Sequence, residues 1–140
     1  IHLATTICGN ELVYYGIHAL EMAYAVLGGG AVSCLNVGQP GRNIVRVRFE
    51  SGRDLLLMVA ERQWMRAGSQ INLYGTKGWR SLTPNLADLY WYLLERFFDL
   101  VRTKKKSVPI EEEVEVIAVL EAGKRSLAEN SEVTVAEVMQ

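Results

Sequence analysis

Two tyrosines, a glycine and a histidine stand immediately before an apolar segment with helical periodicity. His18 is one of only two histidines in the 140-residue chain. It falls in the first turn of the predicted helix, where the positive helix end disfavours an imidazolium cation. A neutral imidazole can take a proton from a hydroxyl group, which is what a general base does. Apolar residues recur on one stripe of this helix until Gly28, a typical terminator: Ile17, Leu20, Tyr24 and Leu27.

Glu21 follows His18 by three residues. At that helical spacing its carboxylate can orient the imidazole or cap the helix. The alternative for His18 is a structural one, a histidine that makes only local hydrogen bonds at a helix start. Position alone favours this structural alternative.

Two other features carry residue types that bind ligands. The stretch "ERQWMR", Glu61 to Arg66, combines an aromatic ring with two arginines and could hold an anionic or sugar-like ligand. A surface segment at a sheet edge explains it more simply. Cys8 and Cys34 lack the spacing of a metal site, so we expect reduced, mostly buried thiols in a reducing compartment, which favours a cytoplasmic protein.

The elements that must position these residues are strands in a block, followed by helices. Strands are predicted at 31–37, 43–50, 54–60, 69–74 and 78–82, and a short one at "EVTV". Val45, Val47 and Phe49 should share one strand face, and segment 54–60, apolar on both faces, should be a central strand covered on both sides. Helices are predicted from Leu86 to Val101 and from Pro109 to about Asn130.

This order predicts an α+β fold, a mostly antiparallel, open-faced sheet of about six strands with helices packed on one face. One apolar sheet face should then lack an internal partner, either the row of Val45, Val47 and Phe49 or the opposite row of Leu56 and Met58. Such a face usually meets another subunit.

Composition excludes several classes of function. The chain has 15 basic and 16 acidic residues and a formal net charge of −1, so nothing in it attracts nucleic acid or anionic lipid. No apolar stretch reaches membrane-spanning length. The glycines of "LGGGAV" follow a helix and precede a strand, the reverse of a nucleotide-binding fingerprint. We therefore expect no cofactor site and no metal site in this chain.

The segment "YYGIHALEMAYAVLG" resembles the start of the second domain of the Gfo/Idh/MocA family, the glucose-fructose oxidoreductase and inositol dehydrogenase group. The family form D-x-G-x-H-x-x-D, ending in L-x-G, is matched by Gly16, His18, Glu21, Leu27 and Gly28, with Tyr14 in place of the first acid. "INLYGTKGWRSL" and the last helix and strand look similar too, so the resemblance covers nearly the whole chain.

The resemblance implies that residues 1–140 are a C-terminal substrate-binding and oligomerisation domain, truncated at its N-terminal side. The upstream Rossmann domain, which binds NAD or NADP and supplies a lysine from an E-K-P motif, is absent from this chain. The missing Rossmann domain, a small sugar-like substrate and further copies of the chain through the open sheet are the implied partners. His18 matches the catalytic histidine, Gly16 would let substrate and nicotinamide approach, and Tyr14, Tyr15 and Glu21 are the candidates for substrate binding.

Two functions of different classes remain open. The first is part of an NAD(P)-dependent oxidoreductase that acts on a sugar or a related hydroxy compound, with the fragment alone inactive and needing no cofactor. The second is a non-catalytic assembly or ligand-sensing module that kept the fold without the chemistry. Tyr14 in place of the family acid is the feature that favours the second.

Overall fold

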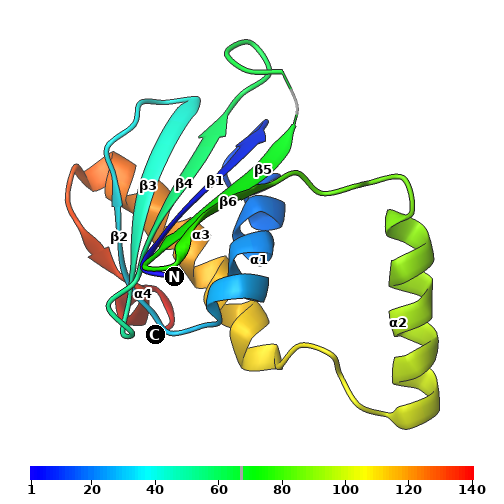
Figure 1. Cartoon of the computed structure of the whole chain (residues 1–140). Coiled ribbons are helices and arrows are strands. Elements are labelled where there is room, and N and C mark those ends of the chain that lie inside the picture. Colours follow the sequence, from blue (N-terminus) through cyan, green and yellow to red (C-terminus); the bar gives the residue numbers. More distant parts are fainter. Residues whose placement is uncertain (67) are drawn as a thin grey trace.

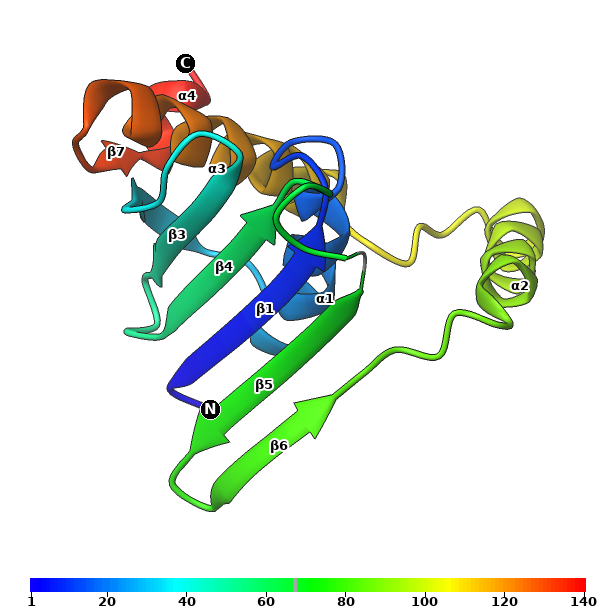
Figure 2. The ribbon, with the colours of Figure 1, turned by 90° about the horizontal axis from the view of Figure 1, so that it is seen from above.

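Seven strands form one sheet in the computed structural model of the protein, which describes residues 1–66 and 68–140. The spatial order of the strands is β6-β5-β1-β4-β3-β2-β7, as Figure 2 shows. Every neighbouring pair is antiparallel except β1 and β4. The strands are β1 (Leu3–Gly9), β2 (Ala31–Asn36), β3 (Arg42–Phe49), β4 (Asp54–Ala60), β5 (Ser69–Gly75), β6 (Gly78–Leu82) and β7 (Val133–Thr134).

Three helices cover one face of this sheet (Figure 1). They are α1 (Gly16–Leu27), α3 (Ile110–Glu129) and the short α4 (Val135–Val138). Side chains that alternate along the strands meet these helices, and together they form the core. Val45, Val47 and Phe49 lie on this covered face, as their spacing predicts, and all three are buried. The predicted α+β architecture with one helical layer is therefore confirmed.

The opposite sheet face carries no helix in the described part of the chain. Ile44, Leu56 and Met58 are adjacent there, because Met58 pairs with Ile44 and Leu56 with Arg46 across β3 and β4. Leu56 and Met58 are only half-buried. Strand β4 is central in the sheet, but the prediction that it is covered on both sides is wrong for the described chain. The uncovered row is the one formed by Leu56 and Met58.

Two glycines allow the helices to approach the sheet closely. A Cβ added at Gly16 would lie 3.2 Å from Val59 Cγ2 and 3.4 Å from Leu12 Cδ1. A Cβ at Gly123 of α3 would lie 3.1 Å from Val45 Cγ1. Gly16 is itself buried under these contacts. The expectation that Gly16 makes room for a ligand is therefore wrong, because it makes room for the helix to pack on β4.

A partly buried carboxylate ties the end of α1 to α3. Glu115 Oε1 accepts hydrogen bonds from the Tyr24 hydroxyl at 2.7 Å and from the backbone N–H groups of Gly30 and Ala31, each at 2.8 Å. Burial, together with this hydrogen bond, raises the pKa of Tyr24. The helix layer is thus held together at the point where α1 turns into β2.

Helix α2 (Leu89–Thr103) stands apart from the rest of the molecule (Figure 1). The predicted helix forms and its apolar stripe is present, but none of its residues is buried. Residues 83–88 and 104–109 connect it to the body without regular structure. The periodicity that predicts α2 is therefore correct, whereas packing of α2 on this chain's own sheet is not observed.

Two elements went unpredicted. Strand β1 lies between β4 and β5, and its segment "LATTICG" is too weakly apolar to stand out from the sequence. Helix α4 follows β7 directly and starts with a capping box formed by Thr134 and Glu137. The remaining predicted elements agree with the structure to within about three residues at each end.

We expect Gly16→Val to destabilise the fold, because its side chain would have to enter the space already filled by Val59, Leu12 and Leu120. Overpacking of this kind costs about 1–3 kcal/mol in the free energy of unfolding. Urea denaturation would measure it. Gly68→Val is the matched control, because a Cβ at Gly68 meets no atom within 4 Å. Equal stability of the two variants would contradict close packing at Gly16.

Candidate functional site

A cavity of about 550 Å³ lies beside the first turns of α1. Its walls come from four parts of the chain: the end of β1, the first half of α1, the start of β5, and the segment between β6 and α2. The lining residues are Cys8, Gly9, Tyr15, His18, Glu21, Met22, Gly68, Ser69, Pro84, Leu86 and Leu89. The size suits a small organic ligand, and the lining is mostly apolar with few polar groups.

His18 faces this cavity from the first turn of α1, as predicted. Its side chain is 65% exposed, and Nδ1 lies 3.5 Å from Glu21 Oε2. A neutral imidazole whose Nδ1–H points at Glu21 keeps Nε2 free as a proton acceptor. Glu21 is thus placed to orient His18, and it caps no helix end, since α1 begins without a side-chain cap.

The two tyrosines before α1 differ in their position. Tyr15 lines the cavity, and its ring meets the His18 ring edge-on with centroids 5.9 Å apart. Tyr14 packs its ring against Tyr15 at 5.4 Å, is 72% exposed, and is not among the lining residues. The structure therefore brings Tyr15, His18 and Glu21 together, whereas Tyr14 contacts Tyr15 from outside the cavity lining.

Cys8 is the second group in the cavity wall with possible nucleophilic chemistry. It is buried, and its S–H donates to the Tyr15 carbonyl oxygen at 3.3 Å. Burial raises the pKa of Cys8 to about 11, although a backbone hydrogen bond from Ala19 opposes the shift. A thiol is a poor nucleophile until it ionises. The buried Cys8 thiol therefore stays protonated near neutral pH.

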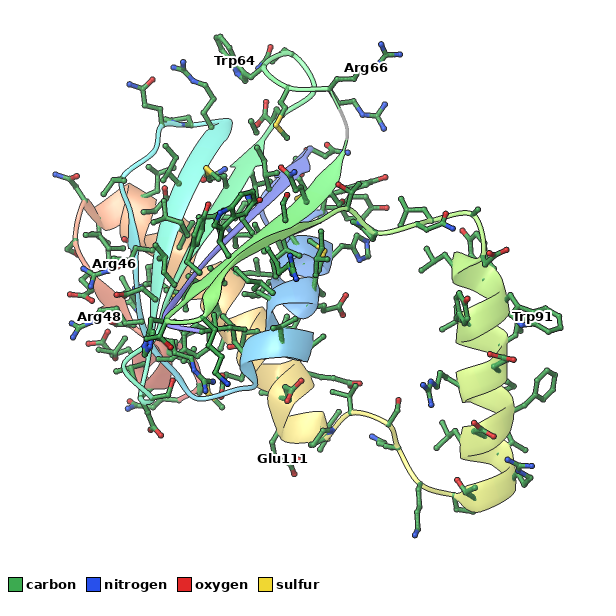
Figure 3. All side chains as sticks on the ribbon, in the orientation of Figure 1. Arg46, Arg48, Trp64, Arg66, Trp91 and Glu111 are labelled. Carbon is green, nitrogen blue, oxygen red and sulfur yellow. The ribbon has the colours of Figure 1, made fainter. Side chains whose placement is uncertain are left out.

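The other sequence candidates lie away from this cavity. Trp64 of the "ERQWMR" loop is covered by Arg42, whose guanidinium carbon lies 4.3 Å from the ring centroid. Figure 3 shows Trp64 and Arg66 on the loop beyond the sheet, far from α2. Cys34 is a buried core thiol on β2. The surface interpretation of the loop and the core interpretation of Cys34 agree with these positions.

The part of the cavity wall that comes after β4 in the chain was not predicted from the sequence. Ser69 begins β5, Pro84 and Leu86 belong to the connection that leads into α2, and Leu89 is the first residue of α2. No local pattern marks these residues. Only the pairing of β5 with β1, which puts Ser69 opposite Cys8, brings them to His18.

Neither a metal centre nor a membrane span is found among the described residues. No three His, Cys, Asp or Glu side chains there are grouped as metal ligands. None of the described helices combines the length and apolar character needed to cross a bilayer.

Known proteins match this chain in fold but not in sequence. No family model and no curated protein sequence matches the chain. Among solved structures, a myo-inositol dehydrogenase from Corynebacterium glutamicum superposes with a TM-score of 0.76 at 15% identity, over 95% of this chain and 56% of that one. The chain has the fold of that part of the dehydrogenase.

Two further structures agree. GenD2 from gentamicin A biosynthesis, in complex with NAD, gives a TM-score of 0.76 at 14% identity and covers 95% of this chain and 55% of GenD2. An oxidoreductase from Agrobacterium radiobacter, in complex with NAD⁺, L-tartaric acid and magnesium, gives a TM-score of 0.74 at 12% identity. The match covers 97% of this chain and 57% of that oxidoreductase. The chain thus spans a little more than half the length of these oxidoreductases, and the resemblance in its sequence to this group is confirmed at the level of the fold.

Both cysteines should react slowly with iodoacetamide in the folded protein. Burial raises the pKa of Cys8 to about 11 and that of Cys34 to about 12, so about one Cys8 in a thousand is thiolate at pH 8. The labelling rate of Cys8 should rise about tenfold for each pH unit while the fold persists. Mass spectrometry of the labelled protein, with a urea-unfolded control, measures this. Complete labelling within minutes at pH 7.5 in the native state would contradict it.

Proposed function

We propose that the chain is the substrate-binding part of an NAD(P)-dependent oxidoreductase that acts on a sugar or a related hydroxy compound. The observation that carries the proposal is the position of His18, which stands at the mouth of α1 in a ligand-sized cavity with Nδ1 turned to Glu21. The family resemblance and the fold shared with NAD-bound oxidoreductases support it.

In this proposal the chain's own residues bind the alcohol and take its proton. His18 Nε2 accepts the hydroxyl proton while Glu21 keeps the ring oriented. The Tyr15 hydroxyl and the Glu21 carboxylate can bind neighbouring hydroxyl groups of the substrate. Tyr14, in the position of the family acid, lies outside the cavity lining and supports Tyr15 through ring contact.

The nicotinamide, NAD or NADP, would be supplied by a Rossmann domain joined to this chain or bound to it. When bound, that cofactor accepts the hydride from the carbon that carries the hydroxyl group. No phosphate-cradling loop precedes a helix in residues 1–66 or 68–140, where the three consecutive glycines follow α1 and precede β2. The residues present therefore fit the substrate and not the dinucleotide.

The uncovered sheet face supports self-association as a second part of the proposal. Ile44, Leu56, Met58 and Trp79 belong to strands with no helix over that face in the described structure. An apolar face of this kind is stable when a second copy covers it.

The alternative is an assembly or ligand-sensing module without chemistry. The exposed Tyr14 in place of an acid is the observation that favours it. The two functions differ in whether His18 is needed for turnover, which the next experiment measures.

In the enzyme that contains both domains, His18→Ala should lower kcat by about a hundredfold or more, because the general base is removed. His18→Asn should do little better, because an amide keeps a hydrogen bond but cannot take the proton. Steady-state kinetics with a panel of polyols measures kcat, and fluorescence titration measures nicotinamide affinity, which should change little. Tyr14→Phe is the control outside the cavity. Near-normal turnover without His18 would contradict the catalytic assignment.

The isolated 140-residue chain should not bind dinucleotide tightly. The physical reason is the missing phosphate site, because a helix N-terminus preceded by a glycine-rich loop supplies most of the contacts to the pyrophosphate. Isothermal titration calorimetry with NADH and NADPH measures this. A dissociation constant in the micromolar range for either cofactor would show that the chain holds a nucleotide site of its own.

A further inference from the structure

Helix α2 exposes more apolar surface than one packing partner can cover. All ten of its large apolar side chains are exposed: Leu89, Tyr90, Trp91, Tyr92, Leu93, Leu94, Phe97, Phe98, Leu100 and Val101. At about 100° per residue, nine of them fill an arc of about 200° and only Tyr92 falls in the polar remainder. A helix on a protein surface needs an apolar stripe of about 100°. Helix α2 is therefore built to be buried on two sides.

The body of the chain offers a groove that fits one side of such a helix. It lies between α1 and α3, has a volume of about 380 Å³, and is lined by Ile17, Glu21, Tyr24, Ala25, Val108, Glu112, Glu113, Val116 and Ile117. Its floor is apolar, and Ile117 is 51% exposed. This α1–α3 groove is unfilled by any described residue of the same chain, since α2 makes almost no contact with α1 or α3.

Charge matches the helix to the groove. The groove is rimmed by three carboxylates, Glu21, Glu112 and Glu113. Residues 89–106 carry five cationic side chains and two acidic ones, with three of the cations at Lys104 to Lys106. Within α2 the two arginines and the two acidic residues balance, so the excess positive charge lies directly after the helix, at Lys104 to Lys106. An acidic rim around an apolar floor attracts an amphipathic helix that leads into such a cationic segment.

We propose that α2 is an exchange arm that binds in the α1–α3 groove of a second copy of this chain. A reciprocal exchange buries one face of each arm, and the other face of each arm then lies at the two-fold axis against its partner. Buried aromatic side chains cover about 150–250 Å² each, and four of the five aromatic residues of α2 lie in its apolar arc. Two arms therefore reach the total of about 1,200–2,000 Å² that a stable interface needs.

The position of α2 favours exchange over closure onto its own body. Both connections leave the body, and the helix stands away from α1 in both views (Figures 1 and 2). Trp91 points away from the body (Figure 3). Closure onto the chain's own groove would still leave about half of the apolar arc in water, whereas a second copy covers both halves.

The exchange also bears on the His18 cavity. Glu21 lines both the groove and that cavity, and Leu86 and Leu89, at the base of the arm, line the cavity as well. An arm from a second copy would therefore lie beside the site and restrict the movement of Glu21. The exchange is independent of catalysis and holds even if His18 has no role in turnover.

Cysteine cross-linking distinguishes the possible occupants of the groove. One copy carries Leu93→Cys in α2, and a differently tagged copy carries Ile117→Cys in the groove. The native Cys8 and Cys34 are buried and should not interfere. After mild oxidation of the mixture, we expect a disulfide-linked heterodimer, with Glu95→Cys on the polar side of α2 as the control that cross-links at least tenfold less.

A chain carrying both Leu93→Cys and Ile117→Cys tests closure onto the same body. Linkage within single chains at every dilution, with no linked dimer, would overturn the proposal.

Light scattering gives the second measurement. Leu93→Gln together with Phe97→Gln should halve the assembly mass, and Glu95→Gln should not. The exchange would be overturned if the α2 double variant kept its assembly mass and Met58→Gln on the open sheet lowered it. That result would assign association to the sheet alone.

Discussion

The contact between Gly16 and strand β4 determines where the groups that α1 contributes to the candidate site lie. Because Gly16 has no side chain, the first turn of α1 packs directly on Val59. His18 comes two residues later and is carried over the carboxyl end of β1, where Cys8 and Gly9 form the cavity wall. At the other end of α1, Glu115 of α3 accepts hydrogen bonds from the Tyr24 hydroxyl and from the Gly30 N–H, and these bonds fix the direction of the helix. A bulkier residue at Gly16 would thus change both the packing and the position of the imidazole.

The single helical layer explains why two apolar surfaces of the described chain stay exposed. With helices on only one face of a seven-stranded sheet, the chain cannot bury all its apolar residues within itself. Leu56 and Met58 remain on the open sheet face, and α2 keeps its whole apolar arc exposed. Both surfaces therefore lack an apolar partner within the described part of the chain. In the proposed exchange, the α1–α3 groove of one copy and α2 of the other, with the cationic segment that follows it, supply the two halves of the contact.

Local periodicity was sufficient to predict most elements, and it failed where the information is not local. The alternation of Val45, Val47 and Phe49, and the stripe of Leu20, Tyr24 and Leu27, identify β3 and α1 because burial imposes a period on each segment. Strand β1 pairs with β4, about 50 residues away, and its burial comes from that parallel pairing rather than from its own composition. The α2 stripe predicts the helix correctly, but no residue of α2 is buried in the described structure, because periodicity does not specify a packing partner. The cavity wall at Ser69, Pro84 and Leu86 was missed for the same reason.

The exposure of His18 separates the two candidate functions on physical grounds. Its side chain is 65% exposed in the described structure. A base in contact with bulk water gains little electrostatic stabilisation of the transition state from the protein around it. Catalysis by this residue therefore requires another body to close the cavity, and the hydride acceptor must arrive from that same open side. A ligand-sensing module has no such requirement, because Tyr15, Glu21 and the apolar wall can hold a small molecule without a lid. Because Nδ1 lies 3.5 Å from Glu21 Oε2, Nε2 is the ring nitrogen that would take the proton of an alcohol in the proposed reaction. A site built only for binding would gain nothing from keeping that nitrogen free.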